Sequence, residues 1–151
     1  MLRLTKRCLV VTTSYLLVLL SVSAMTLGRP VEIPVAEYLR LTQALMELSV
    51  QEWQDRVDSA TENKSDRKKL EQKLEEVAER NRSQRNEVYR RFGISQKEAL
   101  QYASSHASEI ESYLADNPEV NNSIDSLKER IGALVQQFEG IVKPPEEGDR
   151  K

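Results

Sequence analysis

The most constraining feature of this sequence is a stripe of apolar residues between positions 120 and 141. Its members alternate at spacings of four and three residues without interruption, which is the period of one face of an α-helix. A stripe of this kind needs a second helix to cover it, as in a coiled coil. We call the following residues the C-terminal seam, a candidate packing or assembly surface: Val120, Ile124, Leu127, Ile131, Leu134 and Phe138.

The segment from Val35 to Phe92 has the same helical period. Ser49 followed by Glu52 is the pattern of a capping box, which predicts that a new helix starts at Ser49. Residues 49–92 contain neither proline nor glycine, so they form either one long helix or two helices. Their apolar positions fall into two patches separated by polar residues, which favours a turn or kink near Asn63.

Short local signals divide the remaining chain into further helices. Gly93 predicts a helix end, and Ser95 with Glu98 is a second capping-box pattern. Asn117 is the expected cap of the last helix, and Pro118 is its expected first residue. The helix between these two signals is expected to carry a heptad-like apolar set: Leu100, Ala103, Ala107, Ile110 and Leu114.

These patterns predict an all-α fold, consisting of amphipathic helical hairpins or a small helical bundle with coiled-coil-like seams. Three to five helices joined by short turns must pack back on one another. Aromatic residues make up 5% of the sequence and charged residues 30%, so we expect a thin core rather than a bulky one with a deep pocket.

The first 24 residues have the pattern of an export signal. A basic start is followed by an apolar run, Leu9 to Val22, and by the small residues Ser23 and Ala24. The alternative is an uncleaved anchor in the inner membrane formed by residues 1–27, because extending the run just reaches the length of a membrane span. Residues 25–34 are then a linker, residues 35–142 the helical domain and residues 143–151 a disordered tail. We expect an exported protein, periplasmic or extracellular.

Charge is distributed unevenly along the sequence. Residues 109–149 contain ten acidic residues and three basic ones. We favour an internal explanation, in which the helix that contains the arginines between positions 80 and 91 packs beside this acidic segment. The alternative is a face that binds anionic headgroups, acidic polymers or an acidic partner protein. Nucleic acid is not expected as a partner, because the chain is expected to be exported and is acidic overall, with a net charge of −2. The candidate anionic-partner face contains Arg80, Arg82, Arg85, Arg90 and Arg91.

The sequence predicts no catalytic, cofactor-binding or metal-binding residues. His106 is the only histidine, and a metal site needs three or four ligands. The single histidine also disfavours most nucleophile–histidine arrangements. Cys8, the only cysteine, lies within the expected signal, so the mature chain is expected to have no disulfide.

The half of the chain from Gly93 onward resembles a group of uncharacterised secreted bacterial helical domains. The resemblance rests on Gly93-Ile94-Ser95 with Glu98 and Tyr102, and on Asp116-Asn117-Pro118-Glu119-Val120. It implies a helical fold and an exported location, and it carries no activity. A second likeness, to small helical-hairpin chaperones of the periplasm, is limited to Leu41-Thr42-Gln43, whose spacing differs from the repeat of those proteins.

We therefore expect a non-enzymatic, exported helical protein of the bacterial cell envelope that acts by contact with a protein partner or with itself. A periplasmic holdase-type chaperone is one alternative, since amphipathic helices and a thin core suit the shielding of unfolded clients. A membrane-anchored scaffold that binds anionic surfaces is the other. No cofactor is expected in any of the three.

Overall fold

The computed structural model describes residues 33–143. The expected signal, most of the expected linker and residues 144–151 of the expected tail lie outside the described residues. Residues 1–31 and residues 32–151 are two separate units, and the fold described below belongs to the second of them.

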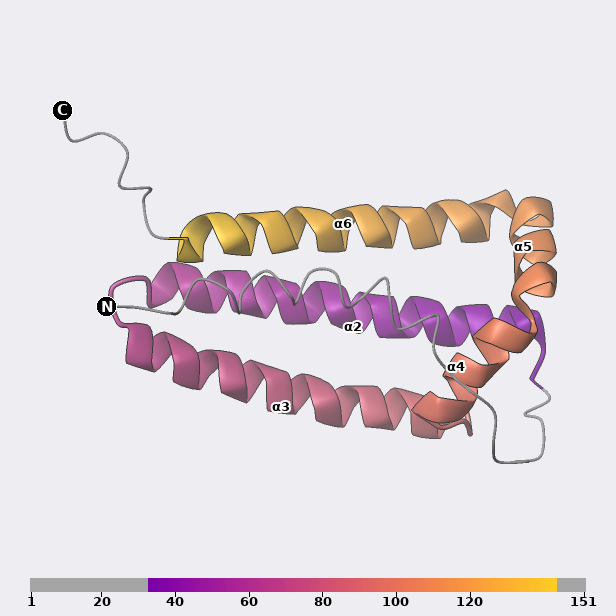
Figure 1. The fold of residues 1–151 in the computed structure, drawn as a ribbon, viewed down its shortest axis with the longest axis horizontal. Coiled ribbons are helices and arrows are strands. Elements are labelled where there is room, and N and C mark those ends of the chain that lie inside the picture. Colours follow the sequence, from indigo (N-terminus) through magenta and orange to yellow (C-terminus); the bar gives the residue numbers. More distant parts are fainter. Residues whose placement is uncertain (1–32, 144–151) are drawn as a thin grey trace, which may run out of the picture. The chain divides into compact units, whose positions relative to one another are not determined.

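The described residues form an all-α unit, as predicted, with five helices and no strand between residues 33 and 143. Figure 1 shows α2 lying between α3 and α6, with α2 and α6 running in one direction and α3 in the opposite one. Both α3 and α6 make extensive contacts with α2, while α4 and α5 lie at the end where α2 begins. The helices are α2 (Val35–Glu62), α3 (Arg67–Arg91), α4 (Gln96–Ser105), α5 (Ala107–Asp116) and α6 (Pro118–Val142).

The turn predicted near Asn63 is present and separates α2 from α3. The Asn63 side chain is buried, and its amide donates to the Ser59 carbonyl at 2.9 Å, which satisfies an end group of α2. Asp66 caps the next helix, because its carboxylate accepts a hydrogen bond from the Lys69 backbone N–H at 3.0 Å. The alternative of one helix across residues 49–92 is therefore wrong.

The helix start predicted at Ser49 is also wrong, because α2 continues through this position. The Ser49 hydroxyl donates to the Leu45 carbonyl one turn earlier, at 3.0 Å, as serine does inside a helix. Glu52 forms an ion pair with Arg56 and does not reach back to the Ser49 backbone. The capping-box pattern has no break in the helix before it, so its residues take other partners.

The second capping box, Ser95 with Glu98, is confirmed at the start of α4. Gly93 before it has a φ of 64°, a left-handed conformation that glycine adopts without steric cost. The heptad-like set predicted for residues 100–114 is wrong. The helix breaks at His106, Leu100 is 46% exposed, and α4 instead buries Ala99 and Tyr102.

Pro118 occupies the first position of α6, as predicted, but the Asn117 side chain does not cap that helix. Its amide instead donates to the Tyr113 carbonyl at 2.7 Å, at the end of α5. With a single residue between the two helices, the side chain satisfies the end of the preceding helix rather than the start of the next one.

The core runs along the contact between α2 and α6. Val50 and Val57 of α2 are buried with Leu134 of α6, and Trp53 packs against the same cluster. The C-terminal seam supplies most of the α6 side: Ile124 and Leu134 are buried, Leu127, Ile131 and Phe138 pack on the cluster, and Val120 is half-buried. The seam is thus covered by α2 within the chain.

Candidate functional site

The five arginines of the candidate anionic-partner face lie on α3, but they do not share one face of it. Side chains two positions apart on a helix point to nearly opposite sides, which separates Arg80 from Arg82. Arg85 is turned toward α2, where it reaches Ser49 and Glu52. The structure therefore does not bring the five guanidinium groups together.

Each of these arginines also has an acidic neighbour. Arg82 pairs with Glu79 at 2.6 Å, and both Arg90 and Arg91 reach Glu87 at 2.7 and 3.5 Å. The hydrogen bonds from Arg90 lower the pKa of the exposed Glu87 carboxyl, and those from Arg91 add to the effect. Such exposed pairs stabilise the fold by only about 0–1 kcal/mol each.

The five arginines therefore pair with acids inside the unit, as predicted. The prediction that these acids belong to residues 109–149 is wrong. Arg80 pairs with Asp55 of α2 at 2.5 Å, and Arg85 pairs with Glu52 of the same helix at 3.5 Å. Within residues 109–143, the acids of the C-terminal segment do not serve as partners of these arginines, because α2 lies between α3 and α6 (Figure 1).

A half-buried polar cluster joins α2 to α3. The Glu52 carboxylate accepts from Arg56 at 2.7 Å and lies 3.5 Å from Arg85. Arg85 also donates to Asn81 at 2.6 Å and to Ser49 at 2.8 Å. Two guanidinium groups share one carboxylate, and the network of hydrogen bonds fixes how α3 packs against α2. We assign this cluster a structural role.

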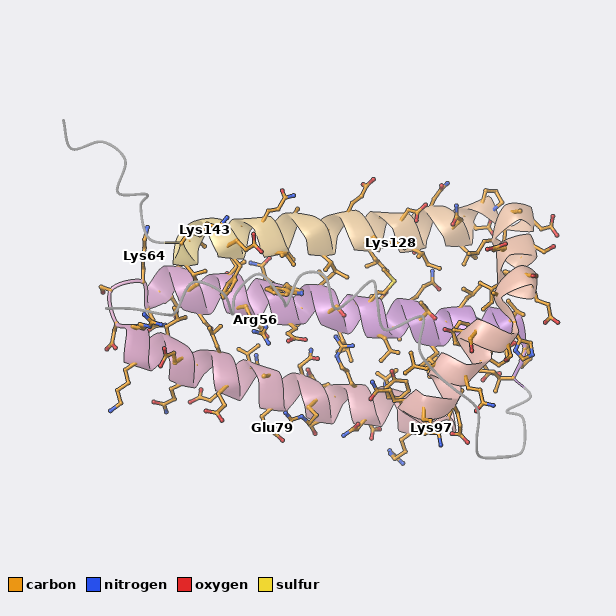
Figure 2. The ribbon with its side chains drawn as sticks, in the orientation of Figure 1. Arg56, Lys64, Glu79, Lys97, Lys128 and Lys143 are labelled. Carbon is orange, nitrogen blue, oxygen red and sulfur yellow. The ribbon has the colours of Figure 1, made fainter. Side chains whose placement is uncertain are left out.

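Sequence reasoning identified Arg85 but missed Asn81, which is buried and donates to the Leu48 carbonyl at 3.2 Å. Arg56 in the same cluster lies over the Trp53 ring, 5.2 Å from its centre, and Figure 2 labels it in the last third of α2. An asparagine among charged residues gives no sequence signal of burial, so only the contact between the helices reveals it.

An open hollow of about 640 Å³ lies between α2 and the second half of α3. Leu48 of α2 and Val88 of α3 supply apolar surface, and Arg90 and Arg91 supply positive charge beside it. Two of the five predicted arginines thus line the same hollow. Sequence reasoning missed its other lining residues, which are Leu48, Ser83, Gln84, Asn86, Glu87 and Val88.

His106 belongs to an aromatic stack at the corner of α2 and α4. The centre of its ring lies 4.0 Å from the ring centre of Tyr102, and the ring centre of Tyr102 lies 4.8 Å from that of Tyr38. The Tyr102 hydroxyl donates to the Ile33 carbonyl at 2.8 Å, and burial raises the pKa of Tyr102. The stack fastens the start of α2 to α4, which gives His106 a structural role.

Within residues 33–143, no group of three or more histidine, cysteine, aspartate or glutamate residues is placed to hold a metal ion. Over the same residues, none of the helices has both the length and the apolar character needed to cross a membrane. The chain matches no protein-family model, and neither the curated proteins nor the solved structures yield a significant match. The resemblance to secreted bacterial helical domains stays a prediction.

Proposed function

We propose that this protein is a non-enzymatic, exported helical protein of the bacterial cell envelope that binds a protein partner through the hollow between α2 and the second half of α3. The observation that supports the proposal best is the placement of Leu48 and Val88 beside Arg90 and Arg91. Apolar surface beside exposed arginine is the usual composition of a surface that recognises another protein.

The chemistry of the hollow favours an acidic, amphipathic segment of the partner. An apolar side chain would contact Leu48 and Val88, and carboxylates would pair with Arg90 and Arg91. Both arginines are engaged by Glu87, but they are 75% and 70% exposed. Exchanging a weak exposed pair for a partner carboxylate costs little, because such pairs contribute only about 0–1 kcal/mol.

Site-specific photo-cross-linking in the native host tests this proposal. A photoreactive residue at Gln84, which lines the hollow, is expected to give one discrete adduct. The same residue at Gln136, an exposed glutamine of α6, serves as the matched control and is expected to give none. Replacing Arg90 and Arg91 with glutamate should abolish the Gln84 adduct. Equal adducts from both positions, or an adduct that survives the charge reversal, would contradict the proposal.

Self-association through the C-terminal seam has less support, because α2 covers the seam. We expect Leu127→Asp combined with Leu134→Asp to unfold the chain rather than only to separate copies of it. A monomeric, fully helical double variant would instead identify the seam as an assembly surface.

The holdase alternative needs exposed apolar surface for unfolded clients. Among the described residues, the large apolar side chains that are clearly exposed are Leu100, at 46%, and Val142, at 41%. We therefore expect the purified protein not to suppress the aggregation of a thermally unfolded model client at equimolar ratio. Suppression at that ratio would favour the holdase.

A further inference from the structure

Unpaired basic side chains gather at the end of the unit where α2 passes into α3. In this region Arg67 pairs with Glu71, and Lys73 pairs with Glu76. Four exposed lysines have no acidic partner within residues 33–143, and we call them the lysine end: Lys64, Lys68, Lys69 and Lys143. They come from the turn, from α3 and from the end of α6, and Figure 2 shows Lys64 and Lys143 at the same end of the unit.

The acids near the lysine end neutralise it only in part. The Asp66 carboxylate is occupied in capping α3, and Glu62 is the last residue of α2. Each of the other helices has an acid in its first turn, whereas α3 begins with Arg67, Lys68 and Lys69 and has none. Positive charge at the positive end of a helix does not stabilise that helix, so these residues are not explained by folding.

The opposite end of the unit is acidic. Helix α5 and the start of α6 carry Glu109, Glu111, Asp116 and Glu119 and contain no lysine or arginine. Three basic residues lie at the same end of the unit, namely Arg90 and Arg91 at the end of α3 and Lys97 in α4, so acids are in excess there but are not the only charges. This end lies where α2 begins, and the lysine end lies where α2 ends (Figure 1). The two ends are therefore separated by the 28 residues of α2, about 42 Å at the usual rise of an α-helix. A negatively charged surface therefore attracts the lysine end more strongly than the end where α2 begins.

We propose that the lysine end docks on the surface of a bilayer of anionic phospholipids. The four ammonium groups pair with headgroup phosphates, and the long aliphatic stems of the lysines lie among the headgroups. Val142, which is 41% exposed and adjacent to Lys143, supplies an apolar contact with the bilayer that a soluble polyanion would not use. The hollow between α2 and the second half of α3 takes no part in this contact, so the proposal stands apart from the proposed protein partner.

Vesicle co-sedimentation of the full chain tests the proposal. The measured quantity is the ratio of two partition coefficients, one for vesicles containing phosphatidylglycerol and one for vesicles of phosphatidylcholine alone. The variant replaces Lys64, Lys68 and Lys69 with glutamine. The matched control replaces Arg82, Arg90 and Arg91 with glutamine, which removes the same charge from exposed but paired positions. Residues 1–31 are identical in all three proteins, so their contribution cancels in the comparison.

Each lysine at an anionic surface strengthens binding about fivefold. Removing three lysines should therefore lower the ratio of the two partition coefficients roughly 100-fold. The arginine control should keep most of it. An unchanged ratio in the lysine variant would overturn the proposal, and so would an equal loss in both variants, which would show a response to net charge alone. Far-UV circular dichroism checks that both variants keep the helical fold.

Val142→Ser distinguishes a bilayer from a soluble polyanion. We expect it to weaken binding to the anionic vesicles and to leave binding to inorganic polyphosphate unchanged. If the wild-type chain binds polyphosphate as tightly as vesicles and the substitution changes neither, the lysine end recognises soluble polyanions and the bilayer proposal is wrong.

Discussion

Gly93 and Gly132 show how differently the backbone constrains the same residue type. Gly93 has a φ of 64°, whereas Gly132 lies inside α6, and at neither position would a Cβ meet an atom within 4 Å other than those of the adjoining backbone. Gly93→Ala should lower the free energy of unfolding by about 1–2 kcal/mol, because alanine is strained in the left-handed region. Gly132→Ala should raise it by about 0.5–1 kcal/mol, because glycine weakens a helix interior. Urea unfolding of the two variants measures both changes, and changes of the same sign would contradict the assignment.

Glu98 links the stability of the fold to pH. Its carboxylate accepts from the Ser95 backbone N–H at 2.7 Å, and hydrogen bonds with Ser95 lower the pKa of Glu98 below that of an ordinary glutamate. A lowered pKa in the folded state gives stability that is present above the unfolded value and lost as the pH falls through the folded one. Glu98→Gln should therefore destabilise the protein at pH 7 and have no effect in strong acid.

Urea unfolding of Glu98→Gln at neutral pH and at about pH 2 measures this difference, since an unperturbed glutamate titrates near 4.3. Glu111→Gln, at an exposed acid of α5 to which no described residue donates a hydrogen bond, is the control and should be neutral at both pH values. A Glu98→Gln effect of equal size at both pH values would mean that its charge is not responsible.

The residues of the candidate site were only partly predictable from the sequence. Arg90 and Arg91 stood out because they lie in a run of arginines. Leu48 and Val88 did not, because apolar residues at helical spacing look the same whether a neighbouring helix covers them or leaves them at an open hollow. That difference depends on how α3 packs on α2, which the local pattern does not determine.

At the scale of helices, the C-terminal seam was predictable because its period is regular over all six of its positions. The same substitution at two leucines tests its importance. Leu134→Ala, at a side chain that is 8% exposed, should cost about 2–3 kcal/mol of unfolding free energy. Leu100→Ala, at a side chain that is 46% exposed, should cost less than about 0.5 kcal/mol. Urea unfolding midpoints of the two variants give the comparison, and equal costs would show that the seam does not form the core.

Two identical local patterns had different outcomes, and the reason lies in the residues before them. Ser95 and Glu98 follow Gly93, which ends the preceding helix and leaves new backbone N–H groups to be capped. Ser49 and Glu52 follow an unbroken helical segment, so no uncapped N–H groups exist there. A capping box predicts a helix start only where the chain has already left the previous helix.

At the scale of the whole helical unit, α2 is shared by both main contacts, so we expect α3 and α6 to unfold together with it. Trp53, the only tryptophan, lies 5.8 Å from Phe138 of α6 between ring centres and reports on that contact by fluorescence. Circular dichroism reports on all the helices. The thermal unfolding transitions followed by Trp53 fluorescence and by circular dichroism should therefore have the same midpoint. A helical signal that persists after the fluorescence change would show that α2 and α3 form an independent hairpin.

Because its acidic end and its lysine end lie at the two ends of α2, the helical unit also spans a defined distance. The helical unit starts at Val35, beside its acidic end, and carries its lysines at the other end of a 28-residue helix. The start of α2 is then held about 42 Å from the surface that the lysines contact. Because helices packed along their length resist bending, the unit would act as a spacer, and inserting whole turns into its three long helices together would lengthen the gap by about 5.4 Å per turn.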